Sequence, residues 1–95
     1  SKLVPADGVY ATWAIVDGKK YGSMTNIGFR PTVDGLHHKI ESHLFDFEGD
    51  LYGQMITLEF VSPIREEMKF AGLDALKEQL ALDEKTSRMI LASNV

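Results

Sequence analysis

The sequence has 95 residues, no cysteine and a formal net charge of −4 at pH 7. This length suits one small domain, and a hydrophobic fraction of 44% is enough for a packed core. The lack of cysteine excludes disulfides, a thiolate nucleophile and a cysteine-ligated zinc site, and it fits a reducing compartment such as the cytoplasm. The acidic balance argues against nonspecific nucleic-acid binding, because neutralising phosphates needs a surplus of Lys and Arg.

The sequence also lacks the signals of membrane proteins. No apolar run approaches the roughly 18 to 20 residues that a membrane helix needs. Residues 1–5 contain no apolar signal-peptide region, so we expect no membrane partner. The first residue is not Met, which leads us to expect a processed product or part of a longer protein.

The first half of the chain is rich in strand-forming residues. A run of them over residues 8–16 is followed by Asp17-Gly18, a pair that favours the type I′ turn of a two-residue hairpin. The sequence therefore predicts that residues 8–16 pair with residues 19–27 in an antiparallel hairpin. Neither face of the first strand is strongly polar, which favours a barrel or sandwich that covers both faces.

Turn formers come next. Gly28, Pro31 and the residues around them predict a loop over residues 26–36. Beyond this loop, apolar residues predict a third strand over residues 38–47.

The last part of the chain changes from strand to helix. Apolar and polar residues alternate over residues 54–61, which predicts a fourth strand that ends at Pro63. Leucines at helical spacing predict a helix over residues 73–80 with Gly72 as its N-cap, and Asp83 is expected to cap a second short helix with a solvated first turn. Strands followed by helix indicate a mainly β fold, an antiparallel sheet or barrel with a C-terminal helix packed on it.

One cluster of side chains could bind a transition metal. His37, His38 and His43 surround Glu41, and imidazoles with a carboxylate are suitable ligands. Adjacent residues of a strand point to opposite faces, so His37 and His38 do not easily share one ion. The competing interpretation, histidines at a loop and a strand edge, is the one that the spacing favours.

Glu41 lies within the third predicted strand and shares a face with His43. A partly desolvated carboxylate there could take a proton from a hydroxyl nucleophile. From the pattern alone, a solvent-facing carboxylate is the simpler interpretation, because carboxylates usually face water.

Two further segments are candidate binding elements. The segment 26–32 could offer polar groups and Arg30 to a phosphate, although its pattern favours a plain turn. The segment 65–70 mixes charges with Met68 and Phe70, which suits a binding loop as well as packing of Phe70 against the next helix. The sequence contains neither a Walker-type phosphate loop nor a dinucleotide-binding glycine pattern.

Several short blocks occur in one order along the chain. They are Pro5-x-x-Gly8-Val9-Tyr10, Asn26-Ile27-Gly28-Phe29-Arg30-Pro31-Thr32, Ile40-Glu41-Ser42-His43-Leu44-Phe45-Asp46-Phe47, Asp50-Leu51-Tyr52-Gly53 and Ile64-Arg65-x-Glu67-x-x-Phe70. In this order and spacing, over nearly the whole chain, they resemble the riboflavin kinase family. The resemblance is greatest to the C-terminal kinase module of bacterial bifunctional riboflavin kinase/FAD synthetases.

The resemblance implies a fold and a reaction. The fold is a six-stranded antiparallel Greek-key barrel with a C-terminal helix. The reaction transfers the γ-phosphoryl group of ATP to the 5′-hydroxyl of riboflavin and yields FMN, a step in FMN and FAD biosynthesis, with Mg²⁺ as the metal ion.

The resemblance also assigns roles to individual residues. Glu41 matches the family's catalytic base, which reverses the interpretation drawn from the pattern alone. The positions that match the family's ATP site are Leu44, Asp46 and Tyr52. The positions that match its flavin loop are Arg65, Met68 and Phe70, and their apolar and aromatic groups suit the isoalloxazine ring.

The sequence departs from the family pattern at its start. Family members carry a Gly-Phe-Pro-Thr-Ala-Asn block on an earlier segment, whose Thr and Asn help to hold the metal and the nucleotide phosphates. We therefore expect residues 1–95 to form a module that lacks the first barrel strand and the metal ligands, preceded in the intact protein by an adenylyltransferase domain. The alternative is a non-catalytic β-barrel module that binds flavin or a protein partner, and the missing block favours it for the chain as it stands.

Overall fold

The computed structural model describes residues 5–94, so residues 1–4, part of the segment expected to lack a signal region, lie outside it. The described residues form four strands and one helix, which are β1 (Gly8–Val16), β2 (Lys19–Thr32), β3 (Gly35–Leu44), β4 (Ile56–Arg65) and α1 (Leu73–Ala92). All strand pairs are antiparallel, in the order β3-β2-β1-β4. The fourth strand returns beside the first, which is the Greek-key order. The prediction of a mainly β Greek-key fold with a C-terminal helix is confirmed.

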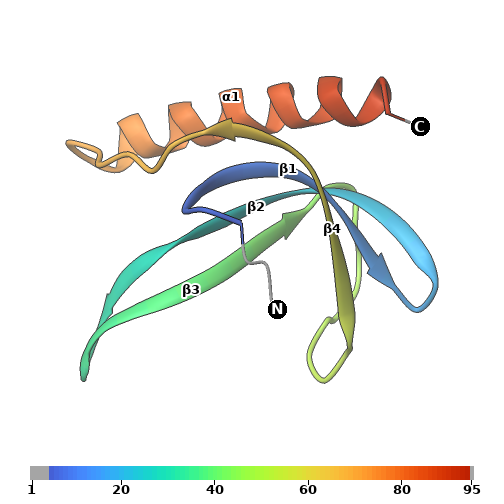
Figure 1. The fold of residues 1–95 in the computed structure, drawn as a ribbon, viewed down its shortest axis with the longest axis horizontal. Helices are drawn as coiled ribbons and strands as arrows, with labels where there is room; N and C mark the ends of the chain where they lie inside the picture. Colours follow the sequence, from blue (N-terminus) through green and yellow to red (C-terminus); the bar gives the residue numbers. More distant parts are fainter. Residues whose placement is uncertain (1–4, 95) are drawn as a thin grey trace.

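The sheet is strongly twisted, and α1 lies along one side of it (Figure 1). Within residues 5–94 the sheet has four strands and is open, with β3 and β4 at its two edges. The closed six-stranded barrel implied by the resemblance is therefore not formed by these residues. The expected missing first strand stays a prediction.

The core lies between α1 and the sheet. Ala11, Phe45 and Leu91 are buried there, and Trp13 and Met24 pack against them. The other face of β1 is also covered, since Thr12 and Ala14 have no exposed surface. The expectation that both faces of the first strand are covered is thus correct.

Hydroxyl groups form a ladder across three strands on that second face. The Thr12 hydroxyl lies 2.6 Å from that of Ser23 and 2.8 Å from that of Thr25, and Thr25 lies 2.7 Å from Ser42. Thr12, Ser23 and Thr25 are fully buried, so these bonds satisfy groups that would otherwise be costly to remove from water. The ladder ties β1, β2 and β3 together in one register.

The hairpin of β1 and β2 confirms the Asp17-Gly18 prediction. Both turn residues have positive φ, 55° and 76°, as a type I′ turn requires. The predicted loop over residues 26–36 is wrong, because β2 continues to Thr32 and only Val33 and Asp34 form the turn. Pairing with β1 ends at Ile27, so Pro31 lies where β2 has a neighbour on one side only and its missing N–H is tolerated.

The other strands differ at their ends. β3 covers Gly35–Leu44 rather than 38–47, and Phe45 donates its backbone N–H to Gly22 as the chain leaves the strand. β4 continues past Pro63 to Arg65, in contrast to the predicted end. Proline fits there because β4 is an edge strand. In addition, the register of β4 against β1 shifts beside Tyr10, the partner of Pro63, which forms a bulge.

The helix is continuous through Asp83, so the predicted second helix is wrong. Gly72 is the N-cap, as predicted, and α1 runs without a break to Ala92. Asp83 does not begin a solvated turn, because its side chain is only 1% exposed and pairs with Arg65. A buried partner from β4 explains a polar residue in the middle of this helix.

Candidate active site

A cavity of about 600 Å³ opens between α1, the helix-facing side of β2 and β3, and the segment that follows β4. One part of its wall is apolar and includes Met68, Phe70, Leu76 and Leu80. Another part carries charged and polar groups, among them Asn26, Arg30, Glu41 and Glu67. A volume of this size, with an apolar wall and a few polar groups, suits an organic molecule that is apolar at one end.

The apolar wall is left uncovered by the protein itself. Met68 is 47% exposed and Leu80 is 38% exposed, whereas Leu91 near the other end of α1 is buried in the core. The first half of α1 therefore presents leucines to the cavity instead of to the sheet. Burial of such a surface by an aromatic ring would be favourable at about 25 cal/mol per Å².

The three predicted flavin residues all line this cavity. Arg65, Met68 and Phe70 contribute to its wall. Arg65 is held in place, since its guanidinium donates to both carboxylate oxygens of Asp83 at 2.7–3.0 Å. It also lies 5.8 Å from the centre of the Phe70 ring, close enough for a cation–π contact. The ion pair of Arg65 with Asp83 fixes the end of β4 against α1.

Glu41 lies in β3 directly opposite Asn26 of β2. Its Oε1 accepts a hydrogen bond from Arg30 Nε at 3.1 Å, and its side chain is 55% exposed. The carboxylate is thus oriented by a cation and remains accessible from the cavity, as a proton acceptor for a bound hydroxyl must be.

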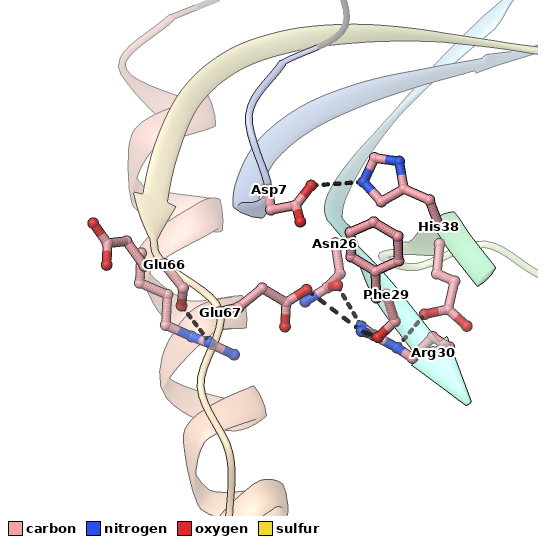
Figure 2. A network of polar contacts seen from close by, with 9 residues as sticks. Asp7, Asn26, Phe29, Arg30, His38, Glu66 and Glu67 are labelled. Atoms are coloured by element: carbon pink, nitrogen blue, oxygen red, sulfur yellow. Dashed lines mark hydrogen bonds and ion pairs between the residues drawn. The ribbon is translucent and has the colours of Figure 1, made fainter. Parts of the chain in front are cut away.

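Arg30 is the centre of a polar network (Figure 2). Besides Glu41, its guanidinium donates to the side-chain oxygen of Asn26, to the backbone oxygen of Phe29 at 2.9 Å and to Glu67 at 3.4 Å. Glu67 reaches Arg30 from the segment after β4 (Figure 2). The network joins β2, β3 and that segment at the polar part of the cavity.

The predicted ATP-site residues lie elsewhere. Leu44 ends β3, and Tyr52 is 93% exposed in the loop before β4. Asp46 has a φ of 58° and accepts two hydrogen bonds from Arg88 of α1, at 2.9 and 3.1 Å. These bonds and the Arg88 charge hold the pKa of Asp46 below its ordinary value. Asp46 lines a second cavity of about 250 Å³ beside Trp13, and among the described residues Leu44 and Tyr52 line neither cavity.

The three histidines do not gather around one point. His37 lies 2.9 Å from Asp34, His38 lies 2.6 Å from Asp7, and His43 packs beside the ring of Phe45. Within residues 5–94, no three His, Asp or Glu side chains are grouped to hold a metal ion. The described structure thus does not bring His37, His38 and His43 together around Glu41 as one set of ligands.

Sequence reasoning named Arg30 of the segment 26–32 as a candidate for phosphate binding but favoured a turn there, and so missed the contact of Arg30 with Glu41. Asn26, Gly28 and Arg30 alternate along β2, and Asn26 pairs directly with Glu41 of β3. The period-two rule would have placed all three on the face of Glu41, had the strand been extended through Pro31. Glu67 carried no signal of its own beyond its place in a charged segment.

Comparisons with known proteins agree with this geometry. The family model described as "Flavokinase: Riboflavin kinase" matches residues 1–91. The chain belongs to the riboflavin kinase family. This family member is similar to bifunctional riboflavin kinase/FMN adenylyltransferases. The enzyme of Escherichia coli (strain K12) is 46% identical to it over 92% of the chain, and the enzyme of Pseudomonas fluorescens is 44% identical over 96% of the chain.

A solved structure is similar as well. A Streptococcus pneumoniae protein described as a macrolide-efflux protein superposes with a TM-score of 0.81 and is 36% identical in sequence. The superposition covers 90% of this riboflavin kinase-family chain and 28% of the Streptococcus pneumoniae chain. The chain spans 28% to 30% of the length of the curated relatives named above. Among residues 5–94, no helix is long and apolar enough to cross a membrane.

Proposed function

We propose that this chain is the riboflavin-phosphorylating module of a riboflavin kinase/FMN adenylyltransferase. One observation carries the proposal: Glu41 lies in the polar part of a cavity whose apolar wall can receive a flavin ring. Riboflavin has the matching shape, because its flat apolar ring carries a hydroxylated chain that ends in the reacting 5′-hydroxyl.

In this proposal each part of the cavity has a task. Met68 and Phe70, with the leucines of α1, bind the isoalloxazine ring, while Arg65 holds the segment that carries them. The ribityl chain then extends toward Glu41. Most of the catalytic effect comes from positioning the hydroxyl in line with the γ-phosphorus of ATP.

Glu41 is the proposed general base. As the 5′-oxygen bonds to the γ-phosphorus, its proton passes to the Glu41 carboxylate, and the bond from the γ-phosphorus to the oxygen of the leaving ADP breaks. Glu41 later gives the proton to water, which restores the carboxylate. The products are FMN and ADP.

The nucleotide side of the site is proposed at Leu44, Asp46 and Tyr52, and ATP is proposed to react as its Mg²⁺ complex. Within residues 5–94, the side chains are not grouped as a metal site, so the steps above are assigned to the chain's own residues alone. We also propose that an adenylyltransferase domain accompanies this module in the intact protein. The cytoplasm is the proposed location, which the lack of cysteine supports.

Riboflavin binding and ADP release, measured on the same sample, test the proposal. In the protein at its natural length, we expect riboflavin fluorescence to be quenched on binding and ADP to appear only when riboflavin and ATP with Mg²⁺ are both present. Binding of riboflavin without ADP release would instead support the non-catalytic flavin-binding module. A sample that neither binds riboflavin nor releases ADP, although it is folded by circular dichroism, would contradict both.

A further inference from the structure

The contacts of Arg30 connect the proposed base to the segment that lines the flavin cavity. Its Nε donates to Glu41, and its terminal nitrogens reach Asn26 and Glu67. A guanidinium is planar and presents its donors in a fixed fork, so anchoring several of them fixes the direction of the others. The orientation of the Glu41 carboxylate therefore depends on what holds the far side of Arg30.

Glu67, from a different part of the chain, accepts the hydrogen bond on that far side of Arg30. It follows β4 and lies one residue before Met68, which lines the apolar wall. A displacement of the backbone at Met68 necessarily reaches Glu67, because the two residues are adjacent. The segment that carries Met68 is thus connected to Arg30 through the contact of Glu67.

Gly28 supplies a second, independent observation on the position of Glu67. A Cβ built on Gly28 would lie 1.7 Å from Oε2 of Glu67 and 2.6 Å from its Cδ, far below any permitted contact. The Glu67 carboxylate therefore occupies the space next to Gly28 that a side chain at this position would fill. Because Gly28 has no side chain and lies two residues before Arg30 on the same strand face, the Glu67 carboxylate can reach Arg30.

We propose that Glu67 is a positioning residue, which couples the flavin-lining segment to Glu41 through Arg30. The proposal rests on the proposed function of the cavity. When the ring of the flavin settles on the apolar wall, Glu67 holds Arg30 and Arg30 holds the Glu41 carboxylate toward the 5′-hydroxyl. The ion pairs involved are partly exposed, so they contribute little to the stability of the fold and their effect is on alignment.

The neighbouring glutamates allow a matched test in the protein at its natural length. Glu67→Gln removes the negative charge that holds Arg30 across 3.4 Å. We therefore expect kcat for FMN formation to fall about tenfold, with the riboflavin dissociation constant unchanged within about twofold. Glu66→Gln makes the same chemical change one residue earlier, and it should keep the wild-type kcat. Thermal midpoints of both variants should match the wild type within about 2 °C, because exposed charges stabilise weakly.

Gly28→Ala tests the same link from the opposite side. The added methyl group displaces the Glu67 carboxylate, so the variant should lose kcat to the same extent as Glu67→Gln. In a Glu67→Ala background the methyl group meets only the terminal Nη1 of Arg30, at 2.9 Å, and Gly28→Ala should then cost clearly less than it does with Glu67 in place. This non-additivity would not arise from a general loss of folding.

The outcomes separate the two proposals. If the wild type makes FMN but Glu67→Gln turns over at the wild-type rate, or if Gly28→Ala costs as much with Ala at position 67 as with Glu, the coupling through Glu67 is wrong and the proposed function stands. If the wild-type protein binds riboflavin and makes no FMN, the proposed function is wrong, and the coupling fails with it.

Discussion

Replacing Glu41 with Gln is expected to lower kcat for FMN formation by roughly 10²–10⁴-fold, the usual contribution of a general base. Gln keeps the size of the side chain and its ability to accept a hydrogen bond from Arg30, but an amide does not take up the hydroxyl proton. Because the apolar wall of the cavity is untouched, riboflavin affinity should change by less than about threefold. Initial-rate kinetics and fluorescence quenching of riboflavin measure the two quantities separately.

Glu48→Gln is the control for this substitution. Glu48 is exposed in the loop after β3 and does not line the cavity. The variant carries the same change of charge and should retain the wild-type kcat. A Glu41→Gln protein with full activity would show that the proton leaves by another route, and Glu41 would then lose its proposed role.

Breaking the buried ion pair between Arg65 and Asp83 is expected to have the largest effect on stability. Asp83→Ala should lower the free energy of unfolding by about 3–5 kcal/mol, because the Arg65 guanidinium, whose side chain is 14% exposed, would be left without its carboxylate. A small domain has a total stability of roughly 5–15 kcal/mol, so much of it would be lost. Urea unfolding followed by the fluorescence of Trp13 gives this difference.

Two comparisons keep this prediction specific. Replacing both partners with apolar residues, Arg65→Met with Asp83→Leu, should recover most of the lost stability, because no charge then remains buried and unpaired. Glu78→Ala, an exposed change on the same helix, should stay within about 0.5 kcal/mol of the wild type. If Asp83→Ala unfolds at the same urea concentration as Glu78→Ala, the pair does not fix β4 to α1 as described.

Two of the features that sequence reasoning described incorrectly have physical reasons in common. Asp83 looked like a helix start because aspartate usually caps helices, and only the approach of Arg65 from β4 makes it a buried residue within α1. Gly28 and Pro31 looked like turn formers because glycine and proline usually break strands. In the fold, Gly28 makes room for Glu67 and Pro31 lies on a one-sided stretch of β2. Each depends on how segments distant in sequence are arranged around the residue, and local propensity does not contain that information.

Local signals succeeded where the partners are close in the chain. Asp17-Gly18 specified its hairpin because the type I′ turn and the two strands are contiguous. The residues proposed for the flavin, Arg65, Met68 and Phe70, were found through the resemblance, and the structure places all three on one cavity with Glu41. Finding the residues that orient Glu41 required the register of β2 against β3. The prediction of a loop over residues 26–36 left no strand there from which that register could be derived.

The central claim is that this site moves a phosphoryl group from ATP onto riboflavin. Incubation of the protein at its natural length with riboflavin, Mg²⁺ and ATP labelled on its γ-phosphorus, with chromatography of the flavins, measures that transfer directly. We expect the label to appear in FMN, one labelled FMN for each ADP formed, and to be nearly absent with Glu41→Gln. Label that appears only as free inorganic phosphate, or remains in ATP while riboflavin is bound, would contradict it.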